Sequence, residues 1–149
     1  MTKIRLTTRF HAPMEKVFDR SRNIDIHMES AMKSKEKAIA GVTSGMISAN
    51  ETVTWRGKHF GMYFTHQSRI TEFDRPHYFV DEMEKGMFKS FRHEHHFEES
   101  EGITTMTDIL TYETPYGIFG KLFDRWLLKK HLTQFLIGRN EFIQKCASI

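Results

Sequence analysis

The sequence predicts an α+β fold in which a long C-terminal helix covers an antiparallel sheet of about seven strands. Residues 3–10 alternate between apolar and polar side chains, which is typical of a strand with one buried face. Six further strand-like segments follow between residues 35 and 113, separated by short turn-like sequences. Residues 118–147 instead repeat apolar side chains every three or four positions, as a helix with one buried stripe does. The 149-residue chain suits a single domain spanning residues 1–149.

Two short helices are expected between the first strand and the rest of the sheet. The stretch HAPMEKVFDRSRN (11–23) predicts the first of them, because Val17 and Phe18 supply a buried side. The stretch IDIHMESAM (24–32) predicts the second. Both helices therefore precede the main run of strands.

The remaining strands are expected to form an antiparallel meander, because the connections between them are short. The predicted strands are residues 35–41, 51–60, 62–72, 77–84, 89–98 and 103–113. A sheet with one apolar face needs a cover, and the C-terminal helix provides an apolar stripe for it. The stripe includes Leu128, Leu132, Phe135, Leu136, Phe142 and Ile143.

Composition excludes several classes of function. The net charge of +3 is modest and the basic residues are scattered, so we expect no nucleic-acid partner. Cys146 is the only cysteine, which excludes an intrachain disulfide framework and a cysteine-rich zinc module. The sequence contains no phosphate-binding loop, dinucleotide fingerprint or G-x-S-x-G motif, and we expect no cofactor.

The sequence predicts a cytoplasmic protein without a membrane span, because it has no apolar signal core and no apolar run of sufficient length. The segment GKLFDRWLLKKHL (120–132) is basic and amphipathic and could lie on a membrane surface. The sheet needs the same apolar stripe as its cover, which argues against that use. Trp55 and Trp126 are expected to belong to the core.

The stretch FRHEHHFEES (91–100) places three histidines within four positions. Successive side chains of a strand point to opposite faces, so His93 and His95 share one face with two phenylalanines. His96 shares the other face with charged residues. We therefore expect His93 and His95 to point inward and His96 to point to solvent.

The turns suggest how these side chains pair across strands. A turn in EKGM places Asp81 opposite His93, and a turn in ESEG places His93 opposite Asp108. A turn in FDRP brings His66 beside Asp81. The prediction is a row, His66–Asp81–His93–Asp108, across four neighbouring strands, with His95 one step along. Side chains opposed in such a ladder are close enough to hydrogen-bond.

Three stretches carry a resemblance to a known superfamily: HAPMEKVFD (11–19), FVDEMEKGMFKSFRHEHHF (79–97) and MTDILTYETPYGIFGKLFDRWL (106–127). The chain resembles the START-like superfamily, also called SRPBCC, which includes pollen-allergen-like proteins and polyketide cyclases/dehydrases. It looks most like a bacterial branch of small polyketide-cyclase-type domains, some of them related to cell-division inhibitors. The resemblance implies a helix-grip fold, in which a curved sheet wraps around the long helix and leaves a cavity for an apolar ligand.

The expected cavity has apolar walls and a polar floor. The apolar wall residues are Phe64, Phe79, Met83, Phe91, Met106, Tyr112 and Phe135. The polar anchoring residues are His66, Asp81, His93, His95 and Asp108. Arg139 lies on the helical stripe and is expected either to reach the cavity mouth or to form a salt bridge there.

The polar row admits several interpretations. It could be a hydrogen-bonded network that fixes strand register, or a lining that orients the polar end of a ligand. It could also be a proton relay in which Asp81 orients His93 as the base. A metal site is not expected, because ligands strung across four strands do not converge on one ion. The one combination left open is His93 and His95, two residues apart, with Asp81 or Asp108.

The leading functional hypothesis is the binding of a small hydrophobic or aromatic, lipid- or polyketide-like molecule in the internal cavity. The first alternative is a cyclase/dehydrase-type enzyme that uses His93 with Asp81 as acid and base. The second is a regulatory or interaction module related to cell division, which only the resemblance suggests. A homodimer is left open.

Overall fold

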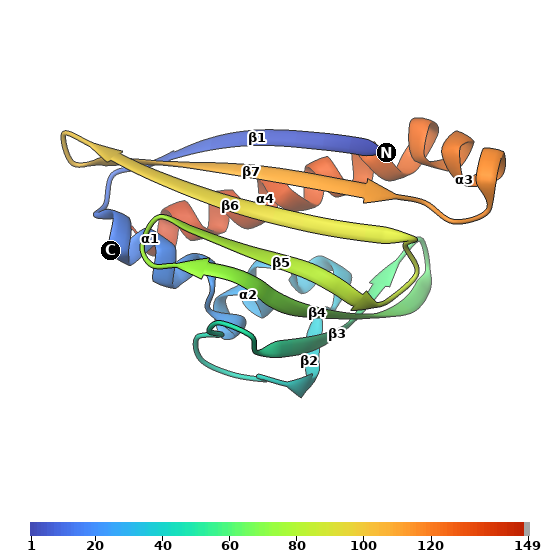
Figure 1. Cartoon of the computed structure of the whole chain (residues 1–149), viewed down its shortest axis with the longest axis horizontal. Helices are drawn as coiled ribbons and strands as arrows, with labels where there is room; N and C mark the ends of the chain where they lie inside the picture. The colour runs from blue at the N-terminus through green and yellow to red at the C-terminus, as the bar shows by residue number, and fades with distance from the viewer. Residues whose placement is uncertain (148–149) are drawn as a thin grey trace.

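A seven-stranded antiparallel sheet forms the larger layer of the computed structural model, which describes residues 1–147 (Figure 1). Its strands lie in the order β1-β7-β6-β5-β4-β3-β2, so β2 to β7 form the predicted meander and β1 pairs with its last strand. The strands are β1 (Thr2–Phe10), β2 (Lys37–Gly41), β3 (Thr52–His59), β4 (Met62–Asp74), β5 (Tyr78–Lys85), β6 (Ser90–Ser100) and β7 (Ile103–Glu113). The α+β class and the strand order predicted from the sequence are confirmed.

Two short helices follow β1, as predicted: α1 (Met14–Ser21) and α2 (Ile24–Ser30), with a 3₁₀ turn, η1 (Met32–Ser34), behind them. The Asn23 side chain caps α2 by accepting a hydrogen bond from the backbone N–H of Ile26. The chain ends in one continuous helical segment made of α3 (Gly117–Phe123), a π-helical turn η2 (Asp124–Leu128) and α4 (Lys129–Ala147). Figure 1 shows α4 lying across the sheet and α3 at one end of it.

The core fills the space between the sheet and these helices. Phe18 of α1 is fully buried and packs edge-on against Phe73, Phe79 and Phe97, with ring centres 5.5, 5.2 and 5.1 Å away. A second cluster joins β1 and β7 to the C-terminal helix through Ile4, Leu110, Tyr112, Leu128 and Leu136. The first cluster also includes Ile143, so α4 contributes to both clusters.

The predicted faces of β6 are confirmed by burial. The side chains of His93 and His95 are 7% and 2% exposed, whereas that of His96 is 41% exposed. Alternation is sufficient for this prediction, because a strand buried on one face fixes the direction of every second side chain.

The predicted register holds for one strand pair and is wrong for two. Asp81 lies opposite His93, as expected. Across β6 and β7, however, His95 rather than His93 lies opposite Asp108. The turn is centred at Glu101–Gly102, where both residues have left-handed φ angles of 52° and 77°, one residue later than predicted. The pairing therefore moves by two residues along one strand and keeps the same face.

His66 does not lie beside Asp81, whose partner on β4 is Ile70. β4 continues to Asp74, and its pairing with β5 shifts at two irregularities, so the turn comes later than the sequence indicated. His66 instead packs against Phe91, with ring centres 4.9 Å apart.

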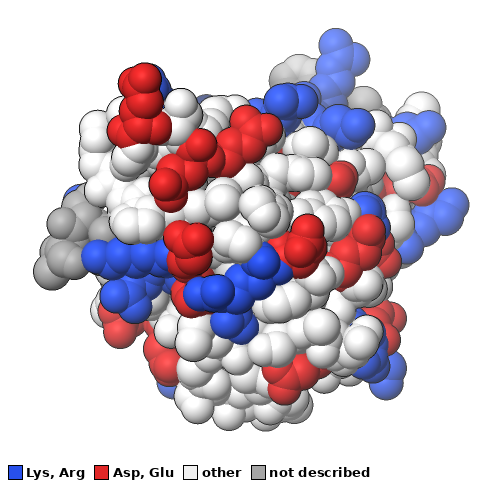
Figure 2. Space-filling view, turned by 60° about the vertical axis from the view of Figure 1, so that its left-hand side comes forward, with Lys and Arg blue, Asp and Glu red and all other residues white. Residues whose placement is uncertain are grey.

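Charged side chains of both signs alternate on the face shown in Figure 2, which has no extended patch of one sign. Among the described residues, none of the helices combines the length and the apolar character needed to cross a membrane. Trp126 is 74% exposed, so its predicted place in the core is wrong.

Candidate functional site

A cavity of about 650 Å³ lies between the inner face of the sheet and the C-terminal helix. Its volume falls within the range of small-molecule sites, and most of its wall is apolar, as such sites require. The sheet contributes Trp55 and Ile70, and α4 contributes Leu132 and Leu136. The space between sheet and helix is thus not filled by the core.

Four of the seven predicted apolar wall residues line this cavity: Phe64, Phe79, Phe91 and Phe135. Met106 does not, because it is fully buried in the core beside Ser21. Tyr112 is also fully buried behind the wall, where its hydroxyl donates a hydrogen bond to Asp124. Met83 packs instead against the turn at Gly86.

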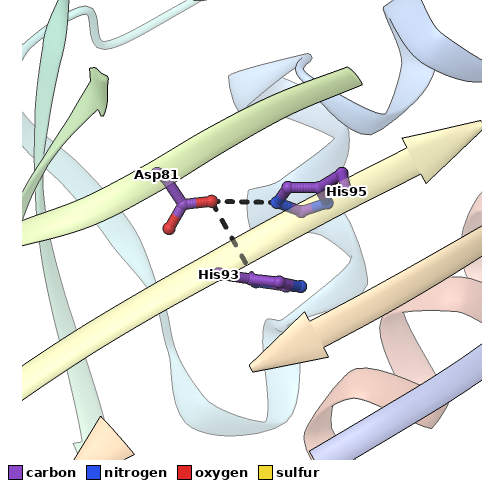
Figure 3. A group of neighbouring side chains, drawn as sticks. All are labelled: Asp81, His93 and His95. Atoms are coloured by element: carbon purple, nitrogen blue, oxygen red, sulfur yellow. Dashed lines mark hydrogen bonds and ion pairs between the residues drawn. The ribbon is translucent and has the colours of Figure 1, made fainter. Parts of the chain in front are cut away.

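Two histidines and two carboxylates meet on the sheet at one side of the cavity, and Figure 3 shows three of them, Asp81, His93 and His95. His93 Nε2 lies 2.8 Å from Asp108 Oδ1, and His95 Nε2 lies 2.9 Å from Asp81 Oδ2. The two imidazoles stack, with ring centres 3.9 Å apart, and Phe79 stacks on the other side of His95 at 4.1 Å. The predicted row is therefore a compact cluster, in which His93 and His95 each have a carboxylate partner.

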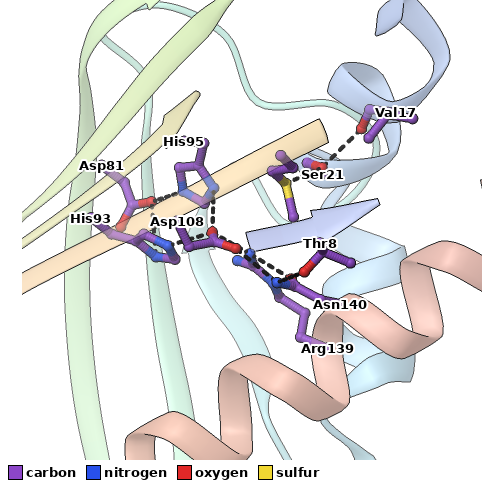
Figure 4. Close-up of polar contacts among 10 residues, drawn as sticks. Thr8, Val17, Ser21, Asp81, His93, His95, Asp108, Arg139 and Asn140 are labelled. Carbon is purple, nitrogen blue, oxygen red and sulfur yellow. Dashed lines mark hydrogen bonds and ion pairs between the residues drawn. The ribbon is translucent and has the colours of Figure 1, made fainter. Parts of the chain in front are cut away.

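Two residues of α4 hold Asp108 in place (Figure 4). Arg139 Nη2 donates to Asp108 Oδ1 at 2.9 Å, and Asn140 Nδ2 donates to Asp108 Oδ2 at 2.7 Å. Asn140 also reaches Thr8 on β1, at 3.0 Å. Arg139 also lines the cavity, so it combines the two alternatives predicted for it, although its salt bridge to Asp108 is buried in the cluster.

Asn140 was not predicted as part of the site. A signal was present in the sequence, because Arg139 and Asn140 stand three and four residues after Leu136 and three or four before Ile143. Those are core positions of the helical stripe. Polar side chains at core positions require buried partners, and here the partner is Asp108.

The cluster strongly perturbs its own protonation. Burial alone would raise the pKa of Asp108, but the Arg139 guanidinium and the hydrogen bond from His93 hold it well below its usual range. Burial likewise opposes ionisation of Asp81, and the hydrogen bond from His95 with the charge of His93 outweighs it, which lowers the pKa of Asp81 to about 2. Both carboxylates are therefore ionised at neutral pH.

The pKa values of the two histidines shift in opposite directions. Burial and the neighbouring His95 lower the pKa of His93. For His95, burial is outweighed by the carboxylates of Asp108 and Asp81, which raise its pKa. His95 therefore binds a proton more readily than His93 does.

These protonation states fix the tautomer of His93. Because Asp108 is ionised and can only accept, His93 Nε2 must donate, which leaves a lone pair on Nδ1 of the neutral ring. Nδ1 lies 4.0 Å from Asp81 Oδ2, an acceptor to which it cannot donate. The Asp81 side chain is 22% exposed and lines the cavity. The cavity floor therefore presents two neighbouring acceptors.

Asp81, His93 and His95 bring three potential metal-ligand atoms within 4.8 Å of one another. These three are a combination that the sequence left open, and they come together because two lie on one strand and one on its neighbour. However, a metal ion lies near the plane of each imidazole that binds it, and the stacked planes meet at only 28°. An ion would therefore require one ring to rotate, and the arrangement suits hydrogen bonding better.

A second polar group lines the cavity nearer its mouth and was not predicted. His59 Nδ1 and His131 Nε2 lie 2.8 Å apart and connect β3 to α4. His59 Nε2 also lies 3.5 Å from Glu36 Oε1. His27 lines the same space, with its ring tilted against that of Trp55 and the ring centres 4.2 Å apart. These residues are spread over α2, β3, α4 and the loop before β2, so no local sequence pattern joins them.

His27 should make the protein less stable in mild acid. Burial and the charge of Arg139 lower the pKa of His27 to about 4, from 6.5 in the unfolded chain. The unfolded state thus binds the proton more readily, so this contribution is complete above about pH 6.5 and disappears as the pH falls towards 4. At about 1.4 kcal/mol for each pKa unit, the loss approaches 3 kcal/mol.

Urea unfolding at about pH 7 and about pH 4.5 measures this effect. His27→Phe retains a ring beside Trp55, and we expect it to lose less stability on acidification than the unchanged protein. His11 is exposed, so His11→Phe is the matched control and should keep the full pH dependence. An identical pH dependence in His27→Phe and His11→Phe would contradict the assignment.

No protein-family model matches the chain, and no curated protein matches it. Solved structures are nevertheless similar to it along nearly its whole length. TTHA0849 from Thermus thermophilus has a TM-score of 0.77 at 18% identity, with 98% of this chain and 99% of that chain covered. The major latex-like protein 151 of Panax ginseng has a TM-score of 0.70 at 14% identity, covering 98% and 97%.

A START superfamily protein from Mycobacterium smegmatis also matches, with a TM-score of 0.73 at 11% identity and coverage of 98% and 97%. The chain therefore has the START-like, helix-grip fold that the sequence predicted. Because identities this low show the fold alone, its function has to be argued from its own cavity.

Proposed function

We propose that this protein binds a small, largely apolar molecule that carries a hydrogen-bond donor. The observation that carries the proposal is the pair of acceptors, Asp81 Oδ2 and His93 Nδ1, at the floor of a largely apolar cavity. A hydroxyl or amine can donate to either atom, whereas a ligand carbonyl or carboxylate would meet only acceptors there. The apolar walls hold the rest of the molecule by removing its surface from water.

The donor can be tested with a matched pair of probes, 2-naphthol and 2-methoxynaphthalene, which differ in whether the oxygen carries a proton. A hydrogen bond to a charged group contributes about 1.5–3 kcal/mol, so we expect 2-naphthol to bind roughly 10- to 100-fold more tightly. Titration calorimetry measures both affinities.

Asp81→Asn should remove most of this preference, because it replaces the ionised acceptor while keeping the shape of the side chain. Glu82→Gln, on the outer face of the same strand, should leave the preference unchanged. Equal binding of both probes by the unchanged protein would refute a donor-selective floor, and binding of neither would refute the ligand site itself.

A second candidate, an acid–base enzyme, is favoured by one specific contact. Asp108 orients His93 through Nε2 and leaves Nδ1 on the cavity side, as a carboxylate does for a histidine that acts as a general base. The orienting carboxylate is therefore Asp108, and not Asp81 as the sequence suggested. In this proposal, His93 removes a proton from a polyketide-like substrate during cyclisation or dehydration.

The variant His93→Gln separates the two candidates. For a binding protein, ligand affinity should persist with a small loss, because Asp81 still accepts a hydrogen bond. For an enzyme, turnover of an aromatic β-hydroxy ketone, followed by its absorbance change, should disappear in His93→Gln. Absence of turnover in the unchanged protein would favour binding alone.

A further inference from the structure

The helical segment α3–η2 turns its apolar side away from the protein. Its exposed apolar side chains are Ile118, Phe119, Leu122, Phe123, Trp126 and Leu127. Phe119 is 77% exposed and Trp126 is 74% exposed, which is unusual for aromatic side chains on a helix of a folded domain. The sequence assigned the apolar side of residues 120–132 to the cover of the sheet, which is wrong for its exposed members Leu122, Phe123, Trp126 and Leu127.

The inner side of the same segment is occupied by Gly120, Asp124 and, at its end, Leu128. Gly120 approaches the backbone of Pro115 so closely that a Cβ atom would lie 1.9 Å from its carbonyl oxygen. Asp124 is buried and accepts hydrogen bonds from the hydroxyls of Tyr112 and Thr2. These contacts fix the rotation of the segment, so its apolar side faces outward as a consequence of the fold.

The exposed apolar side chains extend around the mouth of the cavity. Phe119 and Phe123 line it from α3, and Phe60 and Met62 line it from the turn between β3 and β4. The rings of Phe60 and Phe123 meet edge-on at 5.3 Å. Met87, from the turn between β5 and β6, is also exposed and lines the cavity. We call this exposed apolar set, from 60–62, Met87 and 118–127, the mouth face.

The exposed charges along the helical part of the mouth face are of one sign. Lys121 and Arg125 are exposed on α3–η2, and Lys129 and Lys130 are exposed at the start of α4. Asp124 is the only acidic residue between positions 116 and 137, and it is buried. An exposed surface of aromatic and aliphatic side chains flanked by basic residues is complementary to an anionic lipid surface.

We propose that the mouth face docks on the surface of a bilayer containing anionic phospholipids. In this arrangement, α3–η2 lies in the interface, Trp126 sits at the level of the headgroups, and the cavity mouth faces the lipid. Association with a second copy fits less well. In a two-fold contact through this face, the basic residues of one copy would approach the same residues of the other.

Sedimentation with vesicles of phosphatidylcholine alone, or of phosphatidylcholine and phosphatidylglycerol in equal parts, tests the proposal. We expect the full chain to bind the anionic vesicles much more tightly than the neutral ones. Lys121→Gln and Arg125→Gln should each weaken binding roughly fivefold, because each basic residue near such a surface contributes about that factor. Added salt should weaken it further.

Further variants test the contribution of the apolar side chains to vesicle binding. Phe119→Ala should weaken vesicle binding roughly tenfold, through the loss of apolar surface that the lipid would cover. Met32→Ala is the control, because Met32 is 74% exposed but belongs to η1. It should bind as the unchanged protein does. Trp126→Phe should still sediment but lose the blue shift of tryptophan emission on adding vesicles, because only Trp55 then remains.

Three results would overturn the proposal. One is no sedimentation with either vesicle, and another is equal sedimentation with both. The third is self-association without vesicles that Phe119→Ala removes, which would make the mouth face an interface between copies. Vesicle binding does not depend on the cavity floor, so Asp81→Asn should leave it unchanged. The test of vesicle docking can therefore fail or succeed independently of the test of ligand binding in the cavity.

Discussion

Replacing Asp108 with asparagine is expected to lower the free energy of unfolding by about 3–5 kcal/mol, the usual cost of removing one partner from a buried ion pair. Asp108 is completely buried and contacts Arg139, Asn140 and His93. Without its charge, the Arg139 guanidinium remains buried with no compensating carboxylate on Asp108. Unfolding in urea, followed by circular dichroism, measures the change.

Asp74 provides the matched control for this substitution. Its side chain is exposed at the end of β4, so Asp74→Asn should change the stability by less than about 0.5 kcal/mol. Adding Arg139→Met to Asp108→Asn should recover part of the lost stability, because the unpaired cation is then gone. A loss below about 1 kcal/mol in Asp108→Asn would show that the cluster does not depend on this charge.

Phe18→Ala should lower the free energy of unfolding by a similar amount, about 3–5 kcal/mol. The ring is fully buried and is enclosed by Phe73, Phe79 and Phe97, which belong to three different strands. These rings are held by the sheet and cannot move together to close the space, so a cavity would remain.

The same substitution at Phe119 shows whether the loss of stability comes from burial of the side chain or from the type of residue removed. Phe119 is 77% exposed, and Phe119→Ala should change the stability by less than about 0.5 kcal/mol. Thermal and urea unfolding of both variants, measured under the same conditions, gives the comparison. A large loss in Phe119→Ala would mean that α3 packs more closely than the structure describes, and would also weaken the case for the mouth face.

Much of the fold could be predicted because it depends on local periodicity. The alternation of β6 separates His93 and His95 from His96, and a slip of two residues cannot change that face. The register was less predictable, because it depends on the backbone of the turns. The left-handed pair Glu101–Gly102 moves Asp108 opposite His95, and two irregularities between β4 and β5 take His66 away from Asp81.

The site could be predicted only in part. The inward-facing Asp81, His93, His95 and Asp108 follow from alternation, and they do come together in the structure. Their individual partners could not be predicted, because some contacts join residues that are not directly opposite in the sheet. His93 lies opposite Leu110, yet its side chain contacts Asp108, two residues along β7. The outward rotation of α3 could not be predicted from its apolar residues, because buried contacts of Gly120 and Asp124 determine it.

A crystal structure of the protein with 2-naphthol tests the central claim most directly, because it shows both the occupant of the cavity and its hydrogen-bond partner. We expect the naphthalene rings to lie between Phe91 and Phe135, among the apolar walls. The hydroxyl oxygen should lie within about 3.2 Å of Asp81 Oδ2 or His93 Nδ1. A probe bound only on the outer surface, or one whose hydroxyl points away from this pair of acceptors, would contradict the account.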